Sequence, residues 1–154
     1  MVIIGSDHTG VELKNNIKDY FKEKNIDYID VIKENDENDD YPDIALKICN
    51  EVLNKKNSLG IAICGTGIGI SIACNKIKGI RAAMCTDKYM AKMARNHNDA
   101  NVLCLGARLE SSKKIEDVIC IIENFLEASF EGERHKRRVD KISMLENLEV
   151  KDGN

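Results

Sequence analysis

The sequence lacks a strong excess of charge of either sign and lacks a long apolar segment. The net charge of its 154 residues is −3, which argues against nucleic acid or an anionic membrane as the main partner. The chain opens Met-Val-Ile-Ile-Gly, without the basic region and extended apolar stretch of a signal peptide, and no later segment has the length of a transmembrane helix. We therefore expect a cytoplasmic protein of one domain, with no nucleic-acid or membrane partner.

The cysteines and histidines lack the spacing of a metal site. Six cysteines are scattered along the chain without a C-x-x-C pair, and there are only three histidines. We predict neither a bound metal nor a cofactor. Most of the thiols lie in apolar segments, which is typical of small hydrophobic side chains in a reducing compartment.

Proline occurs once, and elsewhere the chain alternates between strand-like and helix-like segments. Pro42 suits the first turn of a helix. That helix carries an apolar face that includes Leu53, and the polar loop before it, 34–40, has the composition of solvated surface. Strands are expected at 2–4, 28–31, 61–64, 80–84 and 102–105. Helices are expected at 11–21, 42–53, 87–95, 115–126 and 134–148, and a further helix after the third strand should run through residue 75.

This alternation predicts an α/β fold built from right-handed βαβ units. We expect a single Rossmann-like domain, in which residues 1–130 form a five-stranded parallel sheet with helices on both faces. Residues 131–149 should add a C-terminal helix to the same domain. Since no strand follows that helix, we expect it to pack on a partner subunit.

A thiol and three alternating glycines meet at the end of the third expected strand. Cys64 closes an apolar run and is followed by Gly65, Gly67 and Gly69. Ligands of parallel sheets bind at the carboxyl ends of strands, and a glycine-rich strand-to-helix turn directs backbone N–H groups at an anion. This pattern indicates catalysis, and the alternative is a buried structural cysteine before a tight turn.

The same loop lacks the residues that better-known anion-binding loops require. A dinucleotide fingerprint needs a third glycine where Ile70 stands, and a P-loop needs a Gly-Lys-Ser/Thr ending. A cysteine-dependent phosphatase would have arginine at position 70. These absences disfavour a nucleotide-binding module.

The histidines lie in three polar clusters, at 6–10, 95–99 and 131–138. The second cluster is expected after the fourth helix, and the third at the start of the last helix. A loop histidine is often only solvated, Asp7 could be a helix cap, and the arginines at 134–138 could be a charged helix face. Each of these alternatives is reasonable alone, but all three would have to hold together.

The clusters and the glycine loop together resemble the sugar-phosphate isomerase family that contains ribose-5-phosphate isomerase B and the galactose-6-phosphate isomerase subunits. The resemblance spans residues 3 to 142. Two departures are Glu133, where the family usually has a second glycine, and the acidic 34–40 loop. The similar motifs are Gly5-Ser6-Asp7-His8-Thr9-Gly10, Asp40-Tyr41-Pro42-Asp43, Cys64-Gly65-Thr66-Gly67-Ile68-Gly69-Ile70-Ser71, Gly79-Ile80-Arg81-Ala82, His97-Asn98-Asp99-Ala100-Asn101-Val102-Leu103, Leu105-Gly106-Ala107-Arg108 and Glu131-Gly132-Glu133-Arg134-His135.

The resemblance implies a metal-independent aldose–ketose isomerase, with ribose 5-phosphate and ribulose 5-phosphate as the expected pair. Alternatives are a six-carbon sugar phosphate, such as allose or galactose 6-phosphate, or a non-catalytic sugar-phosphate sensor. A sensor would need the phosphate ligands but not the thiol and His97, so the presence of both argues against a sensor. Relatives without the cysteine use a glutamate at the position of Ile70, so this chain is of the cysteine type.

The resemblance also implies residue roles. Cys64 is the base that moves a proton between C1 and C2, Thr66 relays a proton, Asp7 holds hydroxyls and His97 opens the sugar ring. The remaining implied contacts are to substrate oxygens: an anion hole from Gly65, Gly67, Ile68, Gly69 and Ser71, sugar contacts from Asn98 and Tyr41, and phosphate contacts from His8, Arg108, Arg134 and Arg138.

Cys64 and His97 are expected at opposite ends of the sheet. His97 precedes the fifth strand and Cys64 ends the third, so a strand length of roughly 17–20 Å separates them. If both serve one site, His97 must come from another subunit. We therefore expect a homodimer, or a dimer of dimers, with sites shared between subunits.

Overall fold

The computed structural model describes residues 1–148, so residue 149, the last of the predicted C-terminal segment, lies outside the described residues. Within residues 1–148, no helix combines the length and the apolar character that crossing a membrane requires. The elements in chain order are β1 (Val2–Ser6), η1 (His8–Gly10), α1 (Val11–Glu23), β2 (Tyr28–Asp30), α2 (Tyr41–Asn54), β3 (Leu59–Cys64), α3 (Ile68–Cys74), β4 (Ala82–Met84), α4 (Lys88–Asn98), β5 (Val102–Gly106), η2 (Glu110–Ser112), α5 (Ile115–Glu127) and α6 (Glu133–Leu145).

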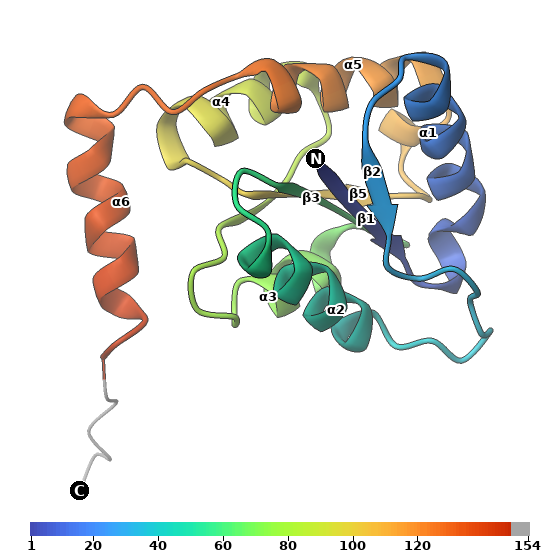
Figure 1. The fold of residues 1–154 in the computed structure, drawn as a ribbon, viewed down its shortest axis with the longest axis horizontal. Helices are drawn as coiled ribbons and strands as arrows, with labels where there is room; N and C mark the ends of the chain where they lie inside the picture. Colours follow the sequence, from blue (N-terminus) through green and yellow to red (C-terminus); the bar gives the residue numbers. More distant parts are fainter. Residues whose placement is uncertain (149–154) are drawn as a thin grey trace, which may run out of the picture.

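The strands form one parallel sheet in the order β2-β1-β3-β5-β4, which confirms the predicted α/β fold. Helices α1, α4 and α5 cover one face, and α2 and α3 cover the other (Figure 1). β1 shows why both faces are closed, because Val2 and Ile4 pack on the first side and Ile3 on the second. Side chains that alternate along a strand and are apolar on both sides are typical of a buried parallel sheet.

Two local predictions differ from the structure, and a third holds in part. Helix α4 continues to Asn98 instead of ending at Arg95, so His97 lies in its last turn. Leu53 is 47% exposed, because it lies about 100° around α2 from the buried Val52. The 34–40 loop is largely exposed, as predicted, but Asn35 and Asp39 in it are half-buried.

Helix α6 stands apart from the layered body (Figure 1). His135 and Val139 are its buried residues, while Ile142, Met144 and Leu145 on its second half are exposed. Apolar residues that one chain leaves uncovered are typical of a surface that packs on another chain. Packing of α6 on a partner subunit remains a prediction.

The first residue of α6 has a strained backbone. Glu133 has φ of +44°, a left-handed conformation that glycine adopts without a steric penalty. Its replacement by glycine should therefore raise the free energy of unfolding by about 1 kcal/mol, a part of the usual cost of a non-glycine residue in this region. The stabilities of Glu133→Gly and Glu133→Ala are compared by thermal unfolding. An increase in stability for the alanine variant but not for the glycine variant would contradict the prediction.

Candidate active site

The turn after β3 directs a backbone N–H at the Cys64 thiol. The N–H of Gly67 donates to Sγ of Cys64 at 3.2 Å, and Cys64 is buried at the end of the strand. Gly67 has φ of +74°, so the turn requires a residue that tolerates the left-handed region. A thiol that already accepts a backbone hydrogen bond is placed to share its negative charge with the loop once it is deprotonated.

Hydrogen bonds to the end of β5 hold this turn in place. Ala107 N–H donates to the carbonyl of Cys64 at 2.8 Å, and Arg108 N–H donates to the carbonyl of Gly65 at 2.9 Å. Arg108 therefore leaves β5 directly beside the glycine loop, with its side chain exposed. This brings a guanidinium to the same sheet edge as the thiol.

The end of β1 brings Asp7 and His8 to that edge as well. Ser6 is in register with Ile63, so Asp7 lies next to the end of β3. The helix-cap alternative for Asp7 is correct for one of its oxygens, because Oδ1 accepts from the N–H of Thr9 at 2.9 Å and from its hydroxyl at 2.6 Å. His8 is exposed, and its Nδ1 lies 3.3 Å from the carbonyl oxygen of Asp39.

Tyr41, Thr66 and Ser71 also lie around the loop. A Cβ atom at Gly69 would lie 2.7 Å from Cζ of Tyr41, so the phenol ring packs directly on the loop and glycine is required there. The hydroxyl of Thr66 accepts from Ile68 N–H at 3.3 Å, and the hydroxyl of Ser71 donates to the Ile68 carbonyl at 2.8 Å. The hydroxyl proton of Ser71 is therefore used in a hydrogen bond within α3.

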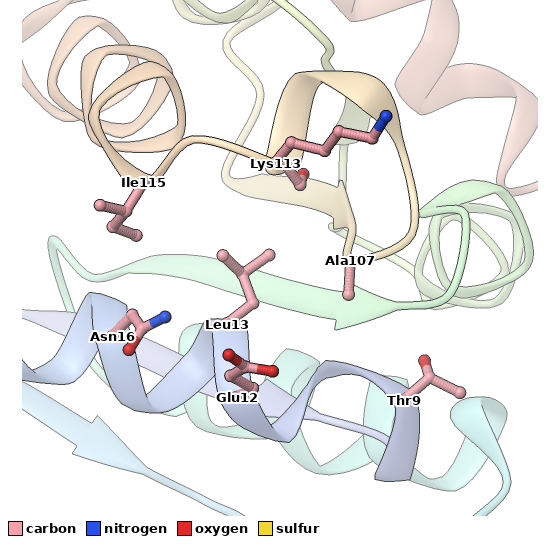
Figure 2. Close-up of a pocket in the computed structure, with 8 residues that line it drawn as sticks. Thr9, Glu12, Leu13, Asn16, Ala107, Lys113 and Ile115 are labelled. Atoms are coloured by element: carbon pink, nitrogen blue, oxygen red, sulfur yellow. The ribbon is translucent and has the colours of Figure 1, made fainter.

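A pocket of about 320 Å³ lies beside this site, between the start of α1 and the segment that follows β5. Figure 2 shows Glu12 and Thr9 on one wall and Lys113 and Ala107 on the other. Of the residues that line the pocket, Thr9 follows His8 in the chain and Ala107 precedes Arg108. The pocket therefore adjoins the predicted site without containing its thiol.

The other predicted residues gather at the opposite end of the sheet. His97 and Asn98 end α4, and Arg134 and Arg138 lie one turn apart on α6. Val102, just after α4, and Gly106, which is in register with Cys64, are separated by about 13 Å at roughly 3.3 Å per residue. The predicted site residues of a single chain thus fall into two groups, called here the two half-sites: Asp7, His8, Tyr41, Arg108 and the 64–71 loop lie in one, and His97, Asn98, Arg134 and Arg138 lie in the other.

The ring of His97 is held by side chains for which no role was predicted from the sequence. Its ring stacks on that of the buried His135, with centroids 4.1 Å apart and planes 8° apart. Glu131 lies beside both rings and accepts a hydrogen bond from Nδ2 of Asn96 at 3.1 Å. The side chains of α4 and the start of α6 therefore form one contact network around the ring.

The ligand atoms of His97, Glu131 and His135 lie within 4.8 Å of one another, which is close enough for a cation site. The two imidazole planes are almost parallel, so the in-plane lone pairs of their nitrogens cannot converge on one ion. In addition, Nε2 of His135 accepts from Nε of Arg134 at 3.3 Å. The trio is therefore better suited to orient His97 than to hold a metal.

A carboxylate between two guanidinium groups fixes the end of α4. Asp99 accepts from Arg81 at 2.8 Å and from Arg95 at 2.9 Å, and Nε of Arg81 donates to the carbonyls of Asn98 and Asp99. Asp99 has φ of +45° and ends the helix. The motifs around Arg81 and Asp99 were visible in the sequence, but their contact depends on the pairing of β4 with β5.

Comparison with known proteins shows the family of the chain. Residues 2–142 match the profile of the family described as Ribose/Galactose Isomerase. The chain belongs to this family. It is 40% identical to ribose-5-phosphate isomerase B of Escherichia coli over 145 residues, which are 94% of this chain and 95% of that protein.

Two solved structures of the family superpose closely on the chain. Ribose-5-phosphate isomerase B of Clostridium thermocellum is 47% identical with a TM-score of 0.87, and covers 94% of this chain and 96% of its own. The Mycoplasma genitalium enzyme with bound ribulose-5-phosphate is 43% identical with a TM-score of 0.86, and the coverage is 96% and 97%. The protein is therefore an isomerase, as the resemblance implied.

We predict that the buried His135 makes the free energy of unfolding depend on pH. Burial and the adjacent cationic or ionisable His97, Arg134 and Arg138 lower its pKa, and only Glu131 opposes them. The unfolded chain, with an ordinary histidine pKa of about 6.5, then binds the proton more readily, so stability should fall as pH decreases through that value. His135→Phe keeps an aromatic ring without a proton site, and its melting temperature should fall less between pH 7.5 and roughly 5.5.

The exposed His8 provides the matched control, because His8→Phe removes a histidine that is not buried. Melting temperatures of the three proteins are compared across the same buffers. If His135→Phe and the wild type lose stability equally, the buried ring is not the source of the pH dependence.

Proposed function

We propose that this isomerase interconverts ribose 5-phosphate and ribulose 5-phosphate, with Cys64 as the base. The observation that carries the proposal is the hydrogen bond from Gly67 N–H to the Cys64 thiol, at the edge where parallel strands end. The related structure with bound ribulose-5-phosphate supports the choice of sugar. The substrate is a five-carbon sugar phosphate, and once its ring is open its C1 and C2 lie against the thiol.

After ring opening, the isomerisation moves one proton from C2 to C1 and one between the hydroxyl oxygens, and it changes no overall oxidation state. His97 takes the proton of the C1 hydroxyl while the ring oxygen gains one, which opens the furanose to an aldehyde. The Cys64 thiolate then removes the proton from C2, giving an enediolate whose oxygen faces the N–H groups of the 65–69 turn. Return of the proton to C1 yields the ketose, and Thr66 passes the hydroxyl proton between O1 and O2.

Asp7 and the phosphate ligands fix the two ends of the sugar. Oδ1 of Asp7 is engaged by Thr9, so Oδ2 is the oxygen that would accept from a sugar hydroxyl. His8 and Arg108 lie at the thiol edge, and Arg134 and Arg138 would arrive from α6 of a second copy. A phosphate dianion suits this set because guanidinium groups offer paired donors.

The separation of the two half-sites supports a site that is shared between subunits. His97 and Asn98 cannot reach the thiol of their own chain across the length of the sheet. A two-fold dimer would pair each thiol edge with the α4–α6 end of its partner and create two equal sites. The exposed apolar residues on α6 support this assembly.

The role of Cys64 is tested by substitution. Cys64→Ala should lower kcat for ribose 5-phosphate by at least about 10²-fold, because a general base contributes roughly 10²–10⁴ in rate. The half-buried Cys120, on α5, gives the control Cys120→Ala, which should keep wild-type activity. Circular dichroism and melting temperature check that both variants fold, and turnover near the wild-type value in Cys64→Ala would refute the assignment.

The shared site is tested by mixing inactive variants. Cys64→Ala and His97→Ala are unfolded together, refolded and assayed with ribose 5-phosphate. Random pairing should restore about a quarter of the wild-type activity, since half the dimers are mixed and each of these has one intact site. Each variant refolded alone is the control. Mixed dimers that are seen by mass spectrometry but stay inactive would show that His97 serves its own chain.

A further inference from the structure

A buried ammonium group lies beneath the loop that precedes α2, and the mechanism above makes no use of it. Lys14, on α1, is 2% exposed. Its Nζ donates to Oδ1 of Asp30 at 3.2 Å, to Oδ1 of Asn35 at 3.2 Å and to the carbonyl of Ile32. Burial of a charge is costly unless such partners surround it, so the arrangement strongly restricts where Asn35 can lie.

Asn35 in turn contacts residues at the thiol edge of the sheet. With Oδ1 held by Lys14, its Nδ2 donates to the carbonyl of Ser6 at 2.7 Å and to Oδ2 of Asp39 at 2.9 Å. The same carboxylate oxygen of Asp39 accepts from the N–H of Asp36 at 2.9 Å. The amide thus ties the end of β1 to both ends of the 35–39 segment.

The 35–39 segment in turn contacts His8. Nδ1 of His8 lies 3.3 Å from the carbonyl oxygen of Asp39, and a carbonyl can only accept, so Nδ1 carries a proton in this contact. Nε2 is then the nitrogen left to face a phosphate, to which it donates when it carries a proton as well. The orientation of the His8 ring therefore depends on a backbone group that Asn35 holds in place.

We propose that Asn35, oriented by Lys14, is a positioning residue for the phosphate-binding half of the site. The inference rests on the proposed function, because it takes His8 as a phosphate ligand. Asn35 does not touch the substrate. It keeps the Asp39 carbonyl where it orients His8, so its loss weakens phosphate binding and leaves the proton transfer at C1 and C2 largely unchanged.

The chain offers matched controls for both residues. Lys18 lies on the same helix and donates to Oδ2 of Asp30 at 2.7 Å, but of these two lysines only Lys14 donates to Asn35. Asn38 lies in the same loop, and within residues 1–148 its backbone N–H and its Nδ2 both donate to Oδ1 of Asp36, at 2.8 and 3.0 Å, and to no other residue. Lys18→Met and Asn38→Ala therefore repeat the chemistry of the substitutions without breaking the contact chain to His8.

The experiment compares full-length Asn35→Ala, Asn35→Asp and Lys14→Met with these controls. KM and kcat for ribose 5-phosphate are measured, with the dissociation constant of inorganic phosphate by calorimetry and the melting temperature. Asn35→Ala should raise KM and the phosphate dissociation constant about tenfold, with kcat within about twofold of wild type. Asn35→Asp keeps an acceptor for Lys14 but has no N–H donor, so it should behave like Asn35→Ala.

The readouts separate positioning from stability and from the proposed function. A lower melting temperature of Asn35→Ala with wild-type KM and phosphate binding would show a purely structural role and overturn the proposal. Asn35 lies in a surface loop, so its variants test the proposal even if Lys14→Met fails to fold. If wild type binds phosphate but does not isomerise ribose 5-phosphate, and Asn35→Ala binds phosphate weakly, the proposed function fails while the positioning role stands.

Discussion

Parallel pairing of β3 with β1 and β5 is the interaction on which the site depends. The register places Ser6 beside Ile63 and Cys64 beside Gly106, so three strands end together. Asp7, the thiol loop and Arg108 follow these ends directly, and backbone hydrogen bonds from Ala107 and Arg108 close the loop on β5. A shift of one residue in either pairing would separate these groups and move the apolar side chains to the wrong face.

The surrounding loops are fixed by polar contacts instead of apolar packing. Lys14 and Asn35 hold the segment before α2, and Asp99 between two arginines holds the end of α4. Both networks lie next to predicted substrate contacts, where groups must be placed accurately and where loops alone would be mobile. Their charged members are more than half buried, which strengthens each hydrogen bond relative to one in water.

The chain divides its predicted catalytic groups between two ends of one sheet. The thiol half contains the glycine-rich turn, and the α4–α6 half contains His97 and two arginines. Neither half contains every group that the proposed mechanism requires. Assembly would therefore be coupled to activity, because only a second copy brings a ring-opening histidine and more positive charge to each thiol.

The sequence by itself determined the βαβ order, the strand positions to within about two residues and the thiol loop, because apolar periodicity and glycine spacing are local signals. The family resemblance supplied the residue roles. Only the tertiary structure decided that Lys14 and Asn35 meet, that Arg81 and Asp99 pair, and that His135 stacks on His97. These contacts join residues far apart in sequence, and the direction of a side chain depends on the packing of whole elements. The sequence does contain one signal for the burial of Lys14, because it shares a helix face with Ile17 and Phe21. Its hydrogen-bond partners, however, are set only by the folded loop.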